Sequence, residues 1–309
     1  MDKKKWNILK IRLATMVAIL FFAPIFCQAG TPSKLTVLVS ANSSPYQTVA
    51  RTIRQTLQAN IQIAEYTPET IDSISAPPQF LITIGSKALK TALNKFPEAP
   101  IIASFLPRRV FEELLSSSSR TLQNTTAIFI DQSMFRQLSL ARLIAPDATI
   151  IGTVFGASSI NERQRLYQAA TETGFTIKSV LLNSEDNPVN TLQPIIQGTD
   201  IFLAIPDQSA FNRASAKWSL FMTLRARKPL IGFSEKYVDA GALTAIFSSP
   251  EQIGKHTTEV IDAYLALGVW PQPEHPRYFY VKSNRQSAHT IQIQLPDNET
   301  LQHRLEGIN

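Results

Sequence analysis

The sequence predicts an α/β protein built from two lobes, each a mostly parallel sheet flanked by helices. From about residue 34, apolar runs of strand length alternate with segments of helical periodicity, which is typical of parallel sheets with right-handed crossovers. The alternation comes in two blocks that meet near residue 131. A hydrophobic content of 44% over 309 residues can supply two cores, and 17% charged residues is too few for a disordered chain.

The first block opens with a strand and a helix. The run Lys34–Val39 is too apolar for a half-exposed strand, so both of its faces are expected to be covered. Within Pro45–Leu57, Val49 and Ile53 lie four residues apart on one helical face. The other expected elements of this block are strands at Ile61–Tyr66, Phe80–Gly85, Ile101–Leu106 and Thr126–Ile130, and a helix beginning at Ser86.

The second block repeats the alternation and ends in a different pattern. Ser249–Gly268 predicts one long helix with Ser249 as its N-cap. A proline-rich segment, a strand at Arg277–Ser283 and a polar end follow. The expected helices before this tail are Met134–Ala145, Ile160–Gly174, Val189–Ile196 and Ser215–Ala226, and the strands are Thr149–Phe155, Thr176–Leu182, Asp200–Ile205 and Pro229–Phe233.

The first 29 residues predict an export signal. Basic residues precede the apolar run Leu13–Phe26, whose 14 residues suit a signal-peptide core and are short for a transmembrane helix. The small residues Cys27 and Ala29 suit a cleavage site, so we expect cleavage after Ala29 and a periplasmic location. A membrane anchor is one alternative. A lipid on Cys27 is another, which the large residue before it disfavours.

The net charge of +6 gives no argument for nucleic-acid binding. Five of the 30 basic residues and one of the 24 acidic residues lie in residues 1–29, so 25 basic and 23 acidic residues remain, a net charge of +2. The single cysteine, Cys27, lies in the same segment. Without it, the chain suits an oxidising compartment and can use neither a disulfide nor a cysteine nucleophile.

No catalytic or metal-binding motif is found in the sequence. The G-x-S-x-G elbow, the Walker loop and G-x-G-x-x-G are all absent, and "TIGSKAL" lacks the second glycine and the Lys-Ser/Thr pair of a phosphate loop. We therefore expect no enzymatic activity, no cofactor and no metal. The four histidines lie in the last quarter of the chain without metal-ligand spacing: His256, His275, His289 and His303.

Polar and aromatic residues stand repeatedly where the predicted strands end. Ligands of open α/β sheets bind beyond the carboxyl ends of the strands, and helix starts offer free N–H groups to a carboxylate. Polar groups would orient a ligand, and aromatic rings would supply contact area. The candidate ligand-binding residues are Ser44, Tyr46, Ser86, Phe105, Ser158, Asn161, Asp207 and Phe233.

Each candidate also has a structural alternative. The serines and Asn161 could be helix caps or loop residues, Tyr46 could face solvent, and the phenylalanines could belong to the core. A carboxylate such as Asp207 at the buried end of a strand is costly without a partner. A ligand ammonium or N–H would be such a partner, but capping the following helix would serve equally well. Arg108 and Arg109 are interpreted as surface residues.

Three stretches resemble the ABC-transporter substrate-binding proteins related to tryptophan and tyrosine uptake, which have the type 1 periplasmic binding protein fold. They are "FLAIPDQSAFN", "KPLIGFSEKYVDAGALTAIFSSPEQIGKHTTEVIDAYLALG" and "PRYFYVKSNRQSA". The second stretch has the family's order of a strand, a small turn and a helix that crosses between lobes. The loop "SFLPRR" lacks the Asp-Pro pair that many relatives carry after the fourth strand, and "ANSSPY" stands where they usually have an acidic or histidine-containing segment, so the ligand is left open.

The resemblance implies two lobes that close over a small ligand by a hinge motion. Crossovers are expected near residues 131, 248 and 273, with residues 30–131 and 249–273 in lobe 1 and residues 132–248 and 274–309 in lobe 2. Carried over to this chain, Ser86, Asp207 and Phe233 match pocket-lining positions, and Tyr46 and Ser158 match more weakly.

The sequence thus favours an exported, monomeric protein that captures a small molecule, such as an amino acid or a related polar-aromatic solute, for an ABC permease. The main alternative is a periplasmic sensor that signals to a membrane regulator. An exported α/β enzyme and a structural export partner are further alternatives, and nucleic acid is not an expected partner.

Overall fold

The computed structural model describes residues 34–57, 62–74, 76–118 and 120–308. The predicted signal peptide and its cleavage after Ala29 lie outside the described residues. The chain from Lys34 to Asn309 forms one compact unit. Within the described residues, no helix is long and apolar enough to cross a membrane.

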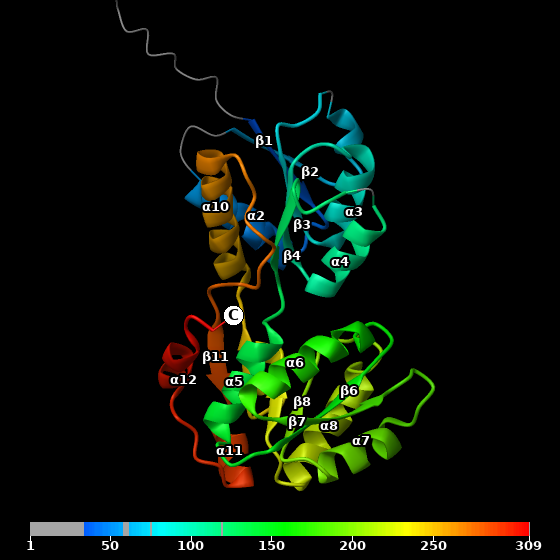
Figure 1. Ribbon diagram of the computed structural model, residues 1–309, viewed down its shortest axis with the longest axis vertical. Coiled ribbons are helices and arrows are strands. Elements are labelled where there is room, and N and C mark those ends of the chain that lie inside the picture. Colours follow the sequence, from blue (N-terminus) through cyan, green and yellow to red (C-terminus); the bar gives the residue numbers. More distant parts are fainter. Residues whose placement is uncertain (1–33, 58–61, 75, 119, 309) are drawn as a thin grey trace, which may run out of the picture. The chain divides into compact units, whose positions relative to one another are not determined.

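The first sheet, called sheet A, has five parallel strands in the order β2-β1-β3-β4-β5 (Figure 1). Its central strands β3 and β4 are buried almost throughout, as their largely apolar sequences require. The strands are β1 (Lys34–Val39), β2 (Gln62–Tyr66), β3 (Leu81–Ile84), β4 (Ile101–Leu106) and β5 (Thr125–Phe129). The helices and turn around it are α2 (Ser44–Thr56), η1 (Ile71–Ser73), α3 (Ser86–Lys95), α4 (Arg108–Ser116) and α10 (Pro250–Leu267).

The second sheet, sheet B, has six strands in the order β11-β10-β9-β8-β6-β7, of which only β11 runs antiparallel to its neighbour. The strands are β6 (Ile150–Phe155), β7 (Thr176–Leu181), β8 (Ile201–Leu203), β9 (Leu230–Gly232), β10 (Thr244–Phe247) and β11 (Tyr280–Ser283). The helices are α5 (Met134–Ile144), η2 (Ile160–Glu162), α6 (Arg163–Thr173), α7 (Pro188–Gln197), α8 (Arg213–Arg225), α9 (Glu235–Asp239), α11 (Arg285–Ile291) and α12 (Asn298–Leu305).

The chain crosses between the elements of sheet A and those of sheet B three times. The crossovers lie between β5 and α5, between β10 and α10, and between α10 and β11. Hydrogen bonds join all three: Gln132 Nε2 donates to Ser248 Oγ at 2.8 Å, and Ser248 Oγ donates to the Tyr278 carbonyl at 2.5 Å. The crossovers are therefore connected to one another as well as to the sheets.

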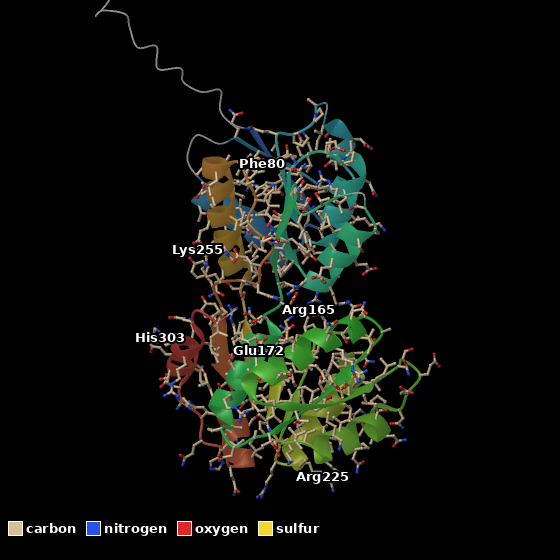
Figure 2. All side chains as sticks on the ribbon, viewed as in Figure 1. Phe80, Arg165, Glu172, Arg225, Lys255 and His303 are labelled. Carbon is tan, nitrogen blue, oxygen red and sulfur yellow. The ribbon has the colours of Figure 1, made fainter. Side chains whose placement is uncertain are left out.

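Helix α10 completes the core of sheet A although it lies about 200 residues after α2 in the chain. Ile253 and Ile261 of α10 are buried in one cluster with Val49 and Ile53 of α2, and the two helices lie side by side in Figure 1. At Gly254 a Cβ atom would come within 2.8 Å of the Thr52 Cβ, so a glycine is needed for this close approach. Phe80, labelled in Figure 2, is fully buried in the same cluster.

The predicted α/β alternation and the two mostly parallel sheets are confirmed. Several short elements were not predicted. Strand β10 lies in a stretch taken as leading from a turn directly into the long helix, α4 and α9 were not assigned, and the end taken as polar contains α11 and α12. The expected helix Ile160–Gly174 begins with the separate turn η2 and ends, as predicted, at Gly174, which adopts a left-handed conformation.

Candidate functional site

A cavity of about 600 Å³ is lined by residues from elements around both sheets. Sheet A contributes the segment after β4, Pro107–Arg109, and the first crossover contributes Ile130–Ser133. Residues that follow β8 and β9 and residues of α6 contribute further walls. These segments converge because the carboxyl ends of parallel strands meet at one edge of a sheet.

The segment after β4 begins with a local irregularity of the strand. Phe105 has a positive φ of 59°, which is uncommon for a residue with a side chain, and the pairing of β4 with β5 shifts register between Ser104 and Leu106. The irregularity lies immediately before Pro107–Arg109, so it sets the path by which the two arginines reach the cavity.

Arg108 and Arg109 line the cavity and form hydrogen bonds with different groups. The Arg108 backbone N–H donates to Asp131 Oδ1 at 2.9 Å, and its Nε donates to Glu112 at 2.9 Å. Arg109 Nη1 donates to the Ser158 carbonyl at 3.0 Å. No carboxylate of the described residues lies within ion-pair distance of Arg109. Its positive charge is therefore available to an anionic group.

A second group of charges connects α4 with α6. Arg165 of α6 binds both carboxylate oxygens of Glu112 on α4, at 2.8 and 2.7 Å, and also binds Glu162 at 2.8 Å. Burial alone would raise the pKa of Glu112, but the bonds from Arg108 and Arg165 lower it below its usual value. Burial raises the pKa of Glu162.

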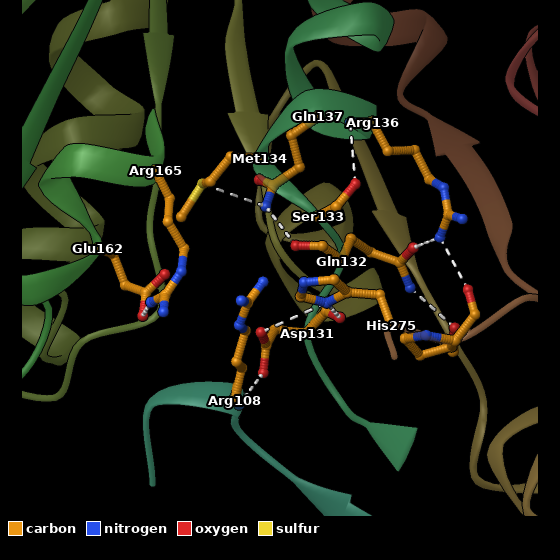
Figure 3. A network of polar contacts seen from close by, with 12 residues as sticks. Arg108, Asp131, Gln132, Ser133, Met134, Arg136, Gln137, Glu162, Arg165 and His275 are labelled. Carbon is orange, nitrogen blue, oxygen red and sulfur yellow. Dashed lines mark hydrogen bonds and ion pairs between the residues drawn. The ribbon is translucent and has the colours of Figure 1, made fainter. Parts of the chain in front are cut away.

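Asp131 and His275 meet in the cavity wall (Figure 3). The His275 Nδ1 lies 2.7 Å from the Asp131 carbonyl oxygen, which can only accept, so Nδ1 carries the proton. Burial raises the pKa of Asp131 to about 6, against the hydrogen bond from the Arg108 N–H. Burial lowers the pKa of His275 to about 4. At neutral pH the aspartate is thus mostly ionised and the histidine is neutral.

Apolar side chains form the rest of the cavity wall. They come from the first crossover, from α5 and from the ends of β8, β9 and β10: Ile130, Met134, Phe135, Ile205, Phe233, Ile246 and Phe247. A cavity that combines cations, carboxylates and aromatic rings suits a small molecule with charged groups at one end and an apolar part.

Of the predicted ligand-binding residues, Phe233 is the one that lines this cavity. Three others gather near the carboxyl ends of β3 and β4 in sheet A. The rings of Tyr46 and Phe105 meet edge to face at 5.4 Å. A Cβ on Gly85 would come within 2.5 Å of the Tyr46 ring, so Tyr46 also covers the turn that precedes Ser86. These three side chains are half-buried.

Ser44, Ser158 and Asn161 are exposed. Ser44 is the first residue of α2, and its predecessor makes no side-chain capping bond. Ser158 meets the cavity through its carbonyl, which binds Arg109, and its hydroxyl is not part of that contact. Asn161 lies in η2 and does not line the cavity.

Asp207 is buried, with 3% of its surface exposed, and it organises the turn that leads to α8. Its Oδ1 accepts hydrogen bonds from the Ser209 N–H, the Ser209 hydroxyl and the Ala210 N–H at 2.8, 2.5 and 3.1 Å. Burial would raise the pKa of Asp207, but the Ser209, Ser159 and Ser158 hydroxyls and the Ala210 N–H hold it below its usual range. Oδ2 is buried without a hydrogen-bond partner among the described residues. One oxygen thus fills the capping role, and the residue as a whole does not line the cavity.

The sequence did not indicate most of the charged groups of the cavity. Arg108 and Arg109, interpreted as surface residues, are half-buried and line it. Both directly follow the fourth strand, so the strand-end rule used for the other candidates would have found them. Asp131 directly follows the expected strand Thr126–Ile130, so the same rule would have marked it. His275 lies in a crossover and Arg165 in a helix, where no local sequence signal marks them. Among the described residues, no group of three His, Cys, Asp or Glu side chains could hold a metal ion.

The family assignment follows from comparison with known proteins. A family model described as "ABC transporter substrate binding protein" matches residues 55–299, so this chain belongs to that family. No curated protein matches the chain. The family consists of binding proteins rather than enzymes, and its members bind small molecules and work with a permease.

Solved structures show the same fold at low sequence identity. A ligand-free, open substrate-binding protein with adhesive properties from Clostridium difficile has a TM-score of 0.69 and 17% identity, covering 86% of this chain and 97% of that chain. An ABC domain in complex with L-Trp from Streptococcus pneumonia has a TM-score of 0.58 and 14% identity, covering 89% and 98%. A periplasmic ribose ABC transporter protein from Conexibacter woesei has a TM-score of 0.50 and 14% identity, covering 85% and 96%.

These likenesses establish the fold. The chain has the type 1 periplasmic binding protein fold, with two mostly parallel sheets flanked by helices and three crossovers. The positions of the lobe boundaries and of the ligand-binding residues stay predictions.

Proposed function

We propose that this chain captures an amino acid or a similar zwitterionic solute with an apolar side chain and delivers it to an ABC permease from the periplasm. The observation that carries the proposal is the cavity of about 600 Å³, which combines a cation lacking a carboxylate partner with aromatic walls. Its volume is in the range of roughly 300–1,000 Å³ typical of small-molecule sites.

The charges of the cavity match the two ends of a zwitterion. Arg109 would bind the ligand carboxylate, because its guanidinium is held in place by the Ser158 carbonyl while its charge is unpaired by the described carboxylates. Asp131, ionised at neutral pH, would attract the ammonium. Phe233 and Phe247 would cover the apolar part of the ligand.

Calorimetric titration and thermal melting would test the proposal on the chain from Gly30 onward, which contains the compact unit Lys34–Asn309. L-Trp is a sensible first probe because one protein of the same fold was solved with it. Tryptamine, which lacks the carboxylate, and ribose are the comparison compounds. We expect stabilisation of about 2.7 kcal/mol by a binding amino acid at a hundredfold excess over its dissociation constant.

The variant Arg109→Gln should weaken amino-acid binding by about tenfold or more, because a charge-assisted hydrogen bond is lost. Arg225→Gln is the matched control, since Arg225 is exposed on α8 and does not line the cavity (Figure 2). Equal affinities in the two variants would contradict the assignment of Arg109. Binding of tryptamine as tightly as L-Trp, or of ribose alone, would overturn the proposed ligand class.

A further inference from the structure

Helix α8 buries small polar residues and exposes three of its large apolar residues. Ser215, Ser219 and Thr223 lie four residues apart, and each is at most 1% exposed. Their hydroxyls bond within the helix: Ser219 Oγ donates to the Ser215 carbonyl at 2.8 Å, and Thr223 Oγ1 donates to the Ser219 carbonyl at 2.7 Å. The hydroxyls of the buried face are thus hydrogen-bonded, and the partly buried Leu220 and Met222 of the same helix pack against the core.

The outward face of α8 carries three large apolar residues. Trp218, Phe221 and Leu224 are 41%, 51% and 40% exposed. The rings of Trp218 and Phe221 meet edge to face at 5.9 Å. Phe221 and Leu224 also line an apolar groove beside Ala240 and Gly241. Clustered exposure of this kind marks an interaction surface, since these residues contribute little to the protein's own core.

Basic residues are interleaved with these apolar residues. At 100° per residue, Arg213, Lys217 and Arg225 fall on the same outward half of the helix as Phe221. All three are exposed, and none forms an ion pair with a described carboxylate. The sequence contains no Asp or Glu between residues 208 and 234. The surface is therefore both apolar and uniformly positive.

The acidic residues that follow α8 in the chain are paired with a cation outside α8. Glu235 and Asp239 of the neighbouring helix α9 both bind Lys282, at 2.8 and 2.7 Å. A second copy of the chain is a poor occupant, because pairing of two identical surfaces would place the cations of one copy against the cations of the other. The fitting occupant is anionic and has an apolar layer beneath its charges.

We propose that the outward face of α8 docks on an anionic lipid bilayer. Trp218, Phe221 and Leu224 would enter the boundary between headgroups and acyl chains, and the flanking cations would bind lipid phosphates. The contact is peripheral, in agreement with the finding that no described helix could span a membrane. It would hold the protein next to a bilayer without occupying the cavity.

Vesicle sedimentation tests the proposal, using vesicles of equal parts phosphatidylglycerol and phosphatidylcholine and vesicles of phosphatidylcholine alone. The protein should start at Gly30, because the apolar run Leu13–Phe26 would itself bind vesicles and the compact unit begins at Lys34. We expect binding to the anionic vesicles that weakens as salt is added. Trp218→Ala combined with Phe221→Ala should lower the partition coefficient by about tenfold or more.

Charge removal provides the matched comparison. Replacing Arg213, Lys217 and Arg225 together by Gln should weaken binding about a hundredfold. Replacing exposed Arg51, Lys90 and Arg304 together by Gln removes the same charge from α2, α3 and α12 and should change binding much less.

Three outcomes would overturn the proposal. The first is absence of binding to anionic vesicles, and the second is equal loss of binding in the two triple variants. The third is a wild-type dimer in gel filtration that dissociates when Trp218 and Phe221 are replaced, because a second copy would then be the occupant. Thermal melting of each variant shows whether it is folded, and the exposure of the replaced side chains predicts that it is.

Discussion

Asp131 and His275 come from different crossovers, and burial in the cavity wall acts on them in opposite directions. The pKa of Asp131 is raised from 3.8 to about 6, so between these values the folded chain keeps a proton that the unfolded chain has lost. The pKa of His275 is lowered from 6.5 to about 4, so between these values the unfolded chain binds a proton that the folded chain does not. Their effects on stability partly cancel.

Single substitutions should separate the two effects. The contribution of Asp131 to stability is lost as the pH rises through 6, and that of His275 is lost as the pH falls from 6.5 towards 4. Relative to the wild type, Asp131→Asn should therefore lose stability as the pH is lowered from 6.5 to 4, and His275→Gln should gain it. Each change should be on the order of 2 kcal/mol.

Thermal melting across this pH range measures both changes. Asp147→Asn, a change of the same kind at an exposed position, is the control. Melting curves of Asp131→Asn and His275→Gln that run parallel to the wild type would contradict the opposed titrations.

At the residue scale, the sequence predicted whether a side chain is buried better than it predicted which groups the side chain contacts. It placed Asp207 at the buried end of a strand, where the structure has it, because strand length and hydrophobicity are local properties. It left open whether the carboxylate caps a turn or meets a ligand. The structure shows the capping bonds on one oxygen and an unpartnered second oxygen. Such a division between two atoms of one group depends on geometry that no local pattern encodes.

At the scale of elements, length and terminal signals made the long helix α10 predictable. Helix α10 has a full capping box: the Ser249 hydroxyl accepts from the Gln252 N–H at 3.2 Å, and the Gln252 side chain accepts from the Ser249 N–H at 3.0 Å. Gly268 ends it in a left-handed conformation. These signals and its length made it recognisable. Strand β10 and helix α9 have only four and five residues, too few for a periodic pattern.

Loss of the α10 cap should destabilise the protein measurably. Ser249→Ala removes the hydroxyl that accepts from the Gln252 N–H and should lower the free energy of unfolding by about 1 kcal/mol. Denaturant unfolding monitored by circular dichroism gives this value. Ser43→Ala is the matched control, because Ser43 is the N-cap of α2, the partner helix, and makes no side-chain capping bond. Equal losses in both variants would show that the hydroxyl at residue 249 acts in another way.

At the scale of the whole molecule, the candidate site could be foreseen only in outline. The strand-end rule placed it at the carboxyl edge of the sheets and found Phe233. The rule also marks Asp131, which directly follows the expected strand Thr126–Ile130, but it cannot find His275 or Arg165, because His275 lies in a crossover whose path depends on the complete fold and Arg165 lies within helix α6. By contrast, each strand and each helix has a residue pattern within its own segment of the sequence. The α/β class was therefore predictable.

The ion pair between Glu112 and Arg165 joins α4, which lies beside sheet A, to α6, which lies beside sheet B. Its loss should therefore loosen the connection between these two halves of the chain, one built around each sheet. We expect Glu112→Ala to increase the radius of gyration in the absence of ligand, because a pair worth about 0.5–1 kcal/mol no longer connects α4 with α6. Small-angle X-ray scattering measures the change. Glu65→Ala is the control, since its pair with Arg54 lies entirely within the elements of sheet A. Unchanged scattering in both variants would mean that the pair does not constrain the halves.

The late position of α10 in the chain also delays the completion of the sheet A core during synthesis. Its apolar residues Ile253 and Ile261 cover the face that Val49 and Ile53 present, and they are synthesised about 200 residues later. At roughly 5–20 residues per second, a growing chain leaves that face uncovered for roughly 10–40 s. The strands that are synthesised first are thus among the last to have their apolar face covered. A newly made chain passes through a long interval in which it can still be held unfolded.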